Sequence, residues 1–504
     1  MASTLPTALA AASLETPPAP EVPERSLDPE NWDAMRALGH RMIDDLMSHL
    51  ATVGDRPVWQ KPNADALQAY AETMPLVGSN PDRVYEEYRR VVQPFEIGAG
   101  HPRFWGWVVG TGTPLGALAD LLASGTNAHA AFGDQSATHI ERQVIRWFTE
   151  LFAMPSTAGG SLVSSGSMAN LTGLIAARDA IAPEVLADGV GSSGVYTVYA
   201  SDEVHNSLDK TVGIIGLGRR NLRRVATDSV YRIRLPELER AIAEDRAAGR
   251  RPMCIVASAG TVNTGAIDDL EALAHITRRE KMWLHVDGAI GAAIGVSRRL
   301  RDRLRGIEHA DSIAFDFHKW FYIPYDVGCV LVRDEQHLRN SFSPPANYLA
   351  PLERGVTGGG VAYGGMGIDL SRRFRALKVW MSFKEHGADR YAEQIEQNVA
   401  QASYLAALVE KAPELELAAP VTLNIVCFRY VGDAASGERQ DAVNREILMR
   451  LQERGIAVPS PTVLEGRFTL RVAITNHRSK RADFDALVAA VLAIGRELGR
   501  ELRA

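Results

Sequence analysis

The segment Ser312-Ile-Ala-Phe-Asp-Phe-His-Lys-Trp-Phe-Tyr322 begins as a short apolar run and passes into a polar sequence that contains Lys319. The apolar run is typical of a buried β-strand, so Lys319 is expected just beyond a strand end. A lysine amine beside a histidine in a partly desolvated pocket can lose its proton and form a Schiff base with an aldehyde. Most lysines are solvated surface charges, so this segment alone does not indicate a catalytic lysine, and the rest of the chain has to be considered.

Apolar runs recur on both sides of this segment and alternate with helical patterns. The predicted strands are 195–200, 253–258, 282–286, 312–315 and 327–332, and the predicted helices between them are 235–248 and 270–281. This alternation predicts an α/β fold with a mostly parallel sheet and helices on both faces. Ligands of such sheets bind beyond the carboxyl ends of the strands, where Lys319 would lie.

The two ends of the chain predict structure outside this sheet. Helical periodicity is found at 29–50, 82–92 and 371–408, and a final mixed region ends in a strand at 468–473 and a helix at 482–498. We therefore expect four parts: a flexible tail at 1–26, an N-terminal helical segment at 27–115, a large domain at 116–385 and a smaller C-terminal α/β domain at 386–504.

Bulk properties exclude several classes of function. The 504 residues are 46% hydrophobic with a net charge of −6, and no stretch is strongly basic, so a nucleic-acid partner is not expected. No apolar run is long enough to cross a membrane, so no membrane association is expected. The cysteines, Cys254, Cys329 and Cys427, are scattered, which predicts neither disulfides nor a metal site and favours the reducing cytoplasm.

Three further motifs could serve one ligand. The turn Ser164-Ser-Gly-Ser-Met-Ala-Asn170 precedes a helical stretch, and free N–H groups at a helix start suit a phosphate, although Ser165 or Ser167 could simply cap the helix. His205 follows a predicted strand and could stack on a flat ring or handle protons, or be a loop residue without a role. Asp287 also follows a strand and could pair with a protonated ring nitrogen, or cap the next helix.

The order phosphate turn, histidine, aspartate, lysine along a parallel α/β sheet suits pyridoxal 5′-phosphate (PLP). Its aldehyde would react with Lys319, and its protonated pyridine ring, paired with Asp287, would act as an electron sink. No G-x-S-x-G elbow or Walker loop is present, so hydrolysis by Ser167 has no support.

The chain resembles the PLP-dependent group II amino-acid decarboxylases of the aromatic-L-amino-acid decarboxylase type, from about Leu27 to the C-terminal helix. The segments that carry the resemblance are His101-Pro-Arg-Phe-Trp-Gly106, Ser164 to Asn170, Ser201-Asp-Glu-Val-His205, Gly260-Thr-Val-Asn-Thr-Gly265, His285-Val-Asp-Gly-Ala289, His318-Lys-Trp320, Leu370-Ser-Arg-Arg-Phe-Arg-Ala-Leu-Lys378 and Leu470-Arg-Val-Ala473.

The resemblance implies fold type I and an interleaved homodimer with active sites at the subunit interface, with 27–115 packing on the partner and 116–385 binding PLP. It also implies a role for each matching residue. Lys319 would carry PLP as a Schiff base, and Asp287 would pair with the pyridine nitrogen. His205 and Ala289 would cover the two ring faces, and Gly166 and Ser167 would bind the phosphate. Thr261 would hydrogen-bond near the cofactor, and His318 would orient the cofactor or the substrate.

One tyrosine bears on the product. Counting back from Arg372-Arg-Phe-Arg375 in register with the family places Tyr363 on the catalytic-loop tyrosine, in a glycine-rich stretch that suits a mobile lid. The resemblance implies that Tyr363 protonates the carbon that CO2 leaves, whereas relatives that make aldehydes often carry Phe there or lack the stacking histidine. The alternative is a loop tyrosine without a role.

The substrate pocket is less specified. The family's pocket positions align with Asn127 and His129, which departs from the animal aromatic enzymes, while Phe104, Trp105 and Trp107 could line a pocket for a flat ring or pack in the core. We expect decarboxylation of an aromatic L-amino acid (Tyr, Trp, Phe or DOPA type) to the amine and CO2. The alternatives are an aromatic aldehyde synthase, a decarboxylase of an acidic amino acid, or an inactive PLP-fold binding protein.

Overall fold

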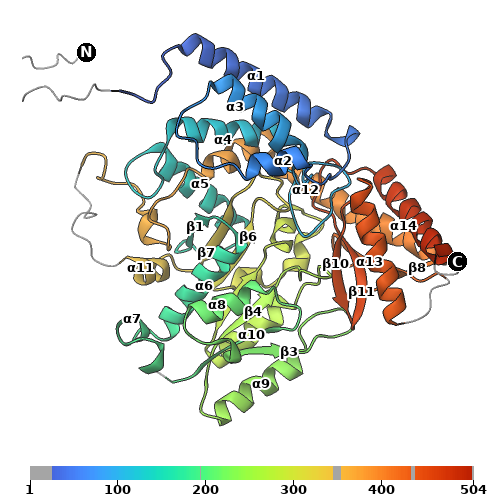
Figure 1. Ribbon diagram of the computed structural model, residues 1–504. Coiled ribbons are helices and arrows are strands. Elements are labelled where there is room, and N and C mark those ends of the chain that lie inside the picture. The colour runs from blue at the N-terminus through green and yellow to red at the C-terminus, as the bar shows by residue number, and fades with distance from the viewer. Residues whose placement is uncertain (1–24, 193, 344–353, 433–436, 502–504) are drawn as a thin grey trace, which may run out of the picture.

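The computed structural model describes residues 25–192, 194–343, 354–432 and 437–501. The expected flexible tail, 1–26, lies almost entirely outside the described residues. At the centre of the molecule is a seven-stranded sheet in the order β1-β7-β6-β5-β4-β2-β3 (Figure 1). Its strands are Gly159–Val163 (β1), Tyr196–Ser201 (β2), Leu222–Val225 (β3), Arg251–Ser258 (β4), Trp283–Asp287 (β5), Ser312–Asp316 (β6) and Gly328–Val332 (β7).

The sheet confirms the predicted fold class. Strands β3, β2, β4, β5 and β6 pair in parallel, and β7 runs antiparallel to both of its neighbours, β6 and β1. Strands β1 and β3 were not predicted. Strands β2, β4, β5 and β6 are almost wholly buried, because helices cover both faces.

Helices pack on the two faces of the sheet around separate cores. One face is covered by α6 (Gly166–Ile181), α8 (Ser207–Ile214) and α11 (Gln336–Phe342), and the other by α5 (Ser136–Leu151), α9 (Leu235–Ala247) and α10 (Leu270–Glu280). Helix α10 illustrates how the sequence determines these elements. The Asp269 side chain caps its first turn, accepting a hydrogen bond from the amide of Ala272, and Leu270, Leu273 and Ile276 recur on its buried face.

The C-terminal region forms a second, smaller layer, as expected (Figure 1). Its antiparallel sheet has the order β10-β11-β9-β8, with the strands Leu415–Leu417 (β8), Ile425–Tyr430 (β9), Ser460–Leu464 (β10) and Arg467–Ala473 (β11). One face of this sheet packs on α12 (Ala376–Lys411), α13 (Glu438–Glu453) and α14 (Arg481–Glu501). Helix α12 joins the two sheets and is interrupted at Gly387, where φ is 68°, one residue after the proposed domain boundary at 386.

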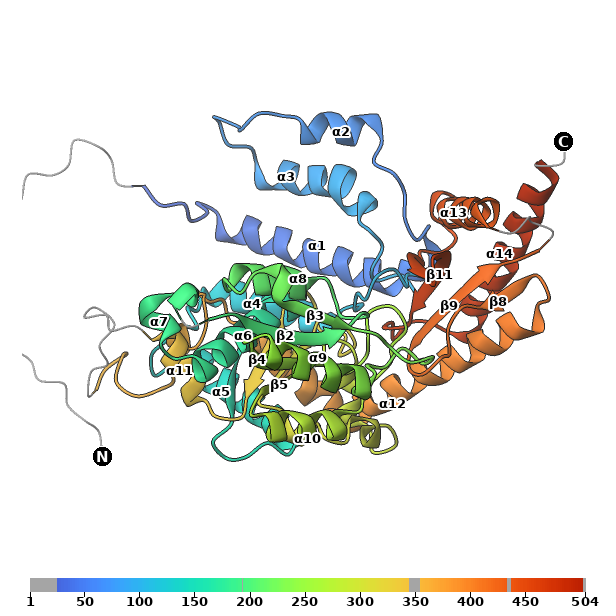
Figure 2. The same cartoon turned by 90° about the horizontal axis from the view of Figure 1, so that it is seen from below.

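The N-terminal segment contains α1 (Trp32–Ala51), α2 (Ala64–Tyr70) and α3 (Pro81–Glu87), followed by α4 (Pro114–Thr126). Figure 2 shows α1 lying along one side of the body, with α2 and α3 beyond it. Several of its apolar side chains are exposed, including Trp32 at 61% and Leu76 at 90%. The end of the segment is part of the small domain, because Phe104 forms a β-bridge with Val458.

Among the described residues, no helix is both long and apolar enough to cross a membrane. In the same ranges, no three His, Cys, Asp or Glu side chains are grouped as they would be to hold a metal ion.

Candidate active site

The carboxyl ends of β2, β4, β5 and β6 meet at one edge of the large sheet, next to the start of α6. A cavity of about 360 Å³ opens there, within the size range of small-molecule sites. Most of the residues predicted to bind the cofactor line this cavity: Gly166, Ser167, His205, Thr261, Asp287, Ala289 and Lys319. Topology thus gathers side chains that are up to 153 positions apart in the chain, from 166 to 319.

Lys319 follows β6 and enters the cavity through a short turn. Its Nζ atom lies 2.7 Å from Oδ2 of Asp316, whose side chain is 1% exposed. The backbone of this turn lies against Gly110, where a Cβ atom would come within 2.2 Å of the Lys319 carbonyl oxygen. The sequence does not predict this role of Asp316, because the contact between its side chain and Lys319 is visible only in three dimensions.

Asp287 ends β5 with both carboxylate oxygens hydrogen-bonded. The side-chain amide of Asn170 donates to Oδ2 at 2.9 Å, and the backbone amide of Ala289 donates to Oδ1 at 3.1 Å. Two donors favour the ionised carboxylate, which is the form that would pair with a protonated ring nitrogen. The bond from Ala289 also shows that Asp287 caps the following turn, and its pairing with a ring nitrogen stays a prediction.

His205 lies in the loop between β2 and α8. The backbone amide of Ser207 donates to its Nδ1 at 3.2 Å, so Nδ1 is an acceptor and the ring proton of the neutral form is on Nε2. Burial is the largest influence on this ring and lowers the pKa of His205, although the nearby carboxylate of Asp287 acts in the opposite direction. The imidazole is therefore uncharged at neutral pH and suited to cover a flat ring.

The start of α6 has the features of a phosphate site. Ser165 caps the helix, accepting a hydrogen bond from the amide of Met168 at 3.4 Å. The amides of Gly166 and Ser167 have no acceptor within the helix, because its first backbone bond runs from the amide of Ala169 to the carbonyl of Ser165. A Cβ atom at Gly166 would lie 2.5 Å from Oδ2 of Asp316, so only glycine fits between the helix and β6. The donors, the cavity and the Lys319 amine together fit a ring that carries an aldehyde and a phosphate.

Thr261 and His318 differ in their relation to the cavity. Thr261 lines it, and its hydroxyl accepts a hydrogen bond from the amide of Ala266 at 3.0 Å. His318 is buried behind it, with its ring 4.1 Å from the ring of Tyr325, which does line the cavity. His318 therefore contacts the site through Tyr325.

The wall on the side of the small domain contains two charged groups that the sequence analysis did not identify. Arg471 of β11 donates to the backbone carbonyl oxygens of Trp107 and Asn263, and among the described residues no carboxylate pairs with it. Burial lowers the pKa of Arg471 to about 10, which leaves it charged at neutral pH. Glu203 accepts a hydrogen bond from the Asn263 side chain at 3.0 Å, and burial raises its pKa.

Phe104 and Trp105, which were predicted to bind the substrate, do not line this cavity. Trp105 stacks on Phe484 with ring centroids 4.9 Å apart, and Phe104 packs against Val458, both in cores away from Lys319. Trp107 lines the cavity instead and is 58% exposed. The aromatic character of Phe104, Trp105 and Trp107 does not predict which of them lines the cavity. The backbone changes direction at Trp107, where φ is 51°, and this separates Trp107 from the other two.

Three predicted residues do not line the Lys319 cavity. Asn127 and His129 are exposed at the end of α4, and neither lines the cavity. Tyr363 is 2% exposed and lines a separate cavity of about 800 Å³, with the Arg372 guanidinium 5.0 Å from its ring centroid. The glycine-rich stretch predicted to form a lid, 358–365, lies within the described residues, and Tyr363 begins a short 3-10 helix there.

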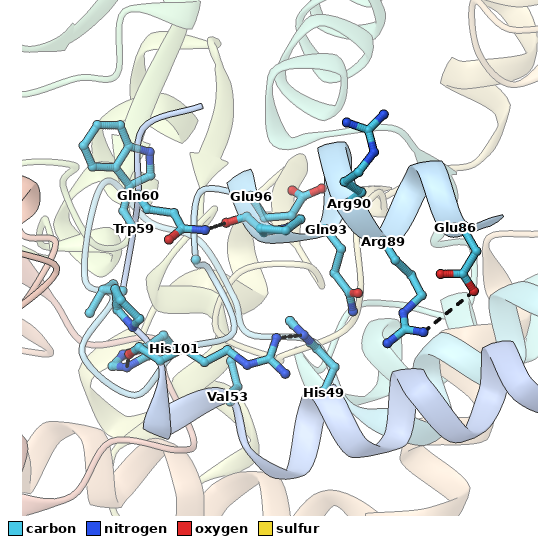
Figure 3. A pocket seen from close by; sticks show the side chains of 15 residues that line it. His49, Val53, Trp59, Gln60, Glu86, Arg89, Arg90, Gln93, Glu96 and His101 are labelled. Atoms are coloured by element: carbon cyan, nitrogen blue, oxygen red, sulfur yellow. Dashed lines mark hydrogen bonds and ion pairs between the residues drawn. The ribbon is translucent and has the colours of Figure 1, made fainter. Parts of the chain in front are cut away.

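A larger cavity, of about 610 Å³, lies between α1 and the segment 56–101 (Figure 3). Some of its polar groups are already partnered: Arg56 contacts His49, and the Gln60 side chain donates to the carbonyl oxygen of Pro94 at 2.8 Å. No lysine amine faces a carboxylate among the residues that line it. The Lys319 cavity is therefore the better candidate despite its smaller volume.

The stability of the protein is expected to depend on His285 in mildly acidic solution. Burial lowers the pKa of His285 from 6.5 to about 4. Between these two pH values the imidazole is protonated in the unfolded chain but neutral in the folded protein. Stability should fall as the pH falls from 6.5 towards 4, by about 2 kcal/mol from this residue at pH 5. Urea denaturation at pH 7 and pH 5 should show a smaller loss for His285→Gln than for the unmodified protein, and equal losses would contradict this.

Comparisons with known proteins agree with this geometry. Residues 65–431 match the pyridoxal-dependent decarboxylase conserved domain. The chain is 35% identical over 470 residues to aromatic-L-amino-acid decarboxylase of Bacillus atrophaeus, covering 92% of this chain and 96% of the relative. It superposes on a crystal structure of Oryza sativa TDC with PLP and tryptamine with a TM-score of 0.87 and 28% identity, covering 94% of this chain and 100% of that one.

Two other relatives carry names that indicate a different product or substrate. The chain is 29% identical to phenylacetaldehyde synthase of Arabidopsis thaliana, covering 89% of this chain and 93% of the relative. It is 32% identical to L-2,4-diaminobutyrate decarboxylase of Rhizobium meliloti, covering 85% and 84%.

Proposed function

This chain belongs to the pyridoxal-dependent decarboxylase family, and we propose that it converts an aromatic L-amino acid into the amine and CO2. The observation that carries the proposal is the convergence of Lys319 and Asp287 on one cavity that also presents the ring of Trp107. An inactive binding protein with this fold would have no physical need for the first two residues. The similarity to aromatic-L-amino-acid decarboxylase supports the aromatic substrate.

The cofactor is PLP, which when bound supplies a protonated ring that accepts the electron pair released as the substrate carboxylate departs. Lys319 would hold it covalently, and Gly166 and Ser167 would donate backbone hydrogen bonds to its phosphate. Asp287 would keep a proton on its ring nitrogen. His205 and Ala289 would cover its two faces, and Thr261 would hydrogen-bond at its edge.

The charged wall would select among substrates. Arg471 would attract the α-carboxylate, since it is a buried cation without a carboxylate partner among the described residues. Glu203 would disfavour an acidic side chain on the substrate, because two carboxylates would then share one cavity. This argues against the acidic amino acids as substrates.

Homodimerisation would complete the site. The exposed apolar side chains of 27–115 suit burial against a second subunit, and Asn127 and His129 would then approach the partner's cavity. Tyr363 would reach its substrate across the same interface, with His318 and Tyr325 supporting the cofactor side.

The described cysteines are buried and unpaired, which suits the cytoplasm.

Two related activities have specific support. An aldehyde synthase is suggested by the Arabidopsis relative, but His205 and Tyr363 together favour the amine. Decarboxylation of 2,4-diaminobutyrate is suggested by Glu203, whose carboxylate could pair with an ammonium group on the substrate side chain.

One experiment separates these activities. PLP-loaded enzyme is incubated with Tyr, Trp, Phe, DOPA, Glu and 2,4-diaminobutyrate, and CO2, amine, aldehyde and H2O2 are measured together. Amine equal to CO2 with an aromatic substrate is the expected result. Peroxide equal to CO2 would identify an aldehyde synthase, turnover of 2,4-diaminobutyrate alone would identify the second activity, and no CO2 from any of them would contradict both.

The position of Trp107 leads to a prediction about substrate affinity. Trp107→Ala should raise the KM for the aromatic substrate about tenfold, because a ring contact of about 1 kcal/mol or more is lost. Trp105→Phe is the matched control, since Trp105 packs on Phe484 away from the cavity and its replacement should lower thermal stability without changing the KM. Equal effects on the KM would show that the cavity does not hold the substrate ring.

A further inference from the structure

Behind Asp287, four buried side chains form a single file of hydrogen bonds that ends on its carboxylate. Trp283 Nε1 donates to Ser312 Oγ at 2.7 Å, and Ser312 Oγ lies 2.7 Å from His285 Nδ1. His285 Nε2 lies 2.8 Å from Asn170 Oδ1, and Asn170 Nδ2 donates to Asp287 Oδ2 at 2.9 Å. None of the four side chains lies on the surface, since their exposed fractions range from 0% for His285 to 5% for Trp283.

The chemistry of the two ends determines the direction of every bond in this file. An indole N–H only donates, so Ser312 accepts from Trp283 and its own hydroxyl proton is free for His285 Nδ1. At the other end the carboxylate of Asp287 only accepts, so Asn170 turns its NH2 group towards it and its carbonyl towards His285. His285 must then carry a proton on Nε2, and its complete burial lowers its pKa, which leaves Nδ1 unprotonated at neutral pH and able to accept from Ser312.

Three elements of the fold combine to build this file. His285 of β5 and Ser312 of β6 are direct partners in the parallel pairing of the two strands, and Asn170 comes from α6, which packs over them. Gly173 leaves room for the ring, since a Cβ atom there would lie 2.8 Å from His285 Cε1. The helix that begins at the phosphate turn thus also contributes the side chain that contacts Asp287.

We propose that Asn170 and His285 are positioning residues that keep the proton shared between Asp287 and the cofactor on the ring nitrogen. This inference rests on the proposed pairing of Asp287 with that nitrogen. A donor held on Oδ2 stabilises the ionised carboxylate and makes Asp287 a weaker base. Without the file, the carbonyl of Asn170 would lose the hydrogen bond from His285 that orients the amide. The proton could then move from the ring nitrogen to Asp287, and a neutral ring withdraws electrons less strongly.

The test reads the ring nitrogen directly. PLP labelled with 15N in the ring is bound to the unmodified enzyme, to His285→Phe and to His285→Gln, and the nitrogen chemical shift is measured together with kcat. We expect a pyridinium-type shift in the unmodified enzyme. In His285→Phe, which cannot donate to Asn170, the signal should move towards neutral pyridine and kcat should fall about tenfold to a hundredfold, the effect of one hydrogen bond to a charged group.

His285→Gln is the matched variant, because its amide can donate to Asn170 and accept from Ser312; it should restore most of the shift and of kcat. Rescue of this kind would not follow from loss of packing alone. Ser312→Ala removes only one hydroxyl from the file and should move the signal in the same direction by a smaller amount. If His285→Phe does not fold, the signal of Ser312→Ala tests the positioning role in its place.

Asp287→Asn separates the two levels of the proposal. If Asp287→Asn leaves the nitrogen signal unchanged, the proposed pairing of Asp287 with the ring is wrong. If Asp287→Asn moves the signal but His285→Phe and Ser312→Ala both keep that of the unmodified enzyme, the pairing stands and the positioning role is overturned.

Discussion

Lys319→Ala is expected to abolish the visible absorbance of covalently bound PLP and to lower turnover by at least about 10³-fold. The variant loses both the covalent anchor of the cofactor and an amine placed to exchange protons in the cavity, and acid–base groups alone contribute about 10²-fold or more. The measurements are the absorbance spectrum after gel filtration and CO2 release. Turnover close to that of the unmodified enzyme would show that another residue holds PLP.

The control has to account for Asp316. Removing the Lys319 ammonium leaves a buried carboxylate whose ion-pair partner at 2.7 Å is gone, which is destabilising. Lys319→Arg keeps a positive charge near Asp316 but cannot form a Schiff base, so it should be as inactive as Lys319→Ala and should unfold at a higher temperature. If only Lys319→Ala is inactive, the loss of activity reflects the ion pair and not the covalent bond.

The sequence predicted β4, β5 and β6 well, because these strands are apolar runs buried on both faces. It did not predict β1, Gly159-Gly-Ser-Leu-Val163, since two glycines and a serine have low strand propensity and the strand exists through its pairing with β7. Strand β3 contains two arginines and lies at the sheet edge, where such residues are tolerated. The reversed direction of β7 depends on tertiary pairing, which no local pattern reveals.

The site also contains residues that a local sequence pattern predicts and residues that only the tertiary structure reveals. Lys319, Asp287 and His205 could be proposed because each follows a predicted strand end, where parallel sheets bind their ligands. Asp316 and Glu203 needed the structure, because a carboxylate one or two positions from a strand end can point either way. His285 lies inside β5 and reads as a core residue; only the pairing of β5 with β6 shows that it contacts Ser312 and, through Asn170, Asp287.

Tyr363→Phe is expected to change the product. The amine yield should fall by at least about a hundredfold, the usual contribution of a positioned general acid, and aldehyde, ammonia and H2O2 should appear as O2 and water are consumed. The reason is that the carbon left by CO2 would wait longer for its proton and O2 could react with it. Burial raises the pKa of Tyr363, which keeps its hydroxyl proton in place until it is needed. An unchanged ratio of amine to H2O2 would contradict the role.

The location of Tyr363 allows a sharper test of how it acts. The Arg372 guanidinium lies over its ring, and Tyr363 lines, with Glu335 and Arg142, a cavity separate from that of Lys319. A direct role therefore requires a partner subunit or a rearranged loop. Dimers that combine one Lys319→Ala subunit with one Tyr363→Phe subunit, purified through two different tags, distinguish these routes. Action across the interface gives each mixed dimer one complete site and about half the amine formation of the unmodified dimer. Action within a subunit leaves both sites incomplete, so a mixed dimer no more active than its parents would place Tyr363 on the rearranged loop.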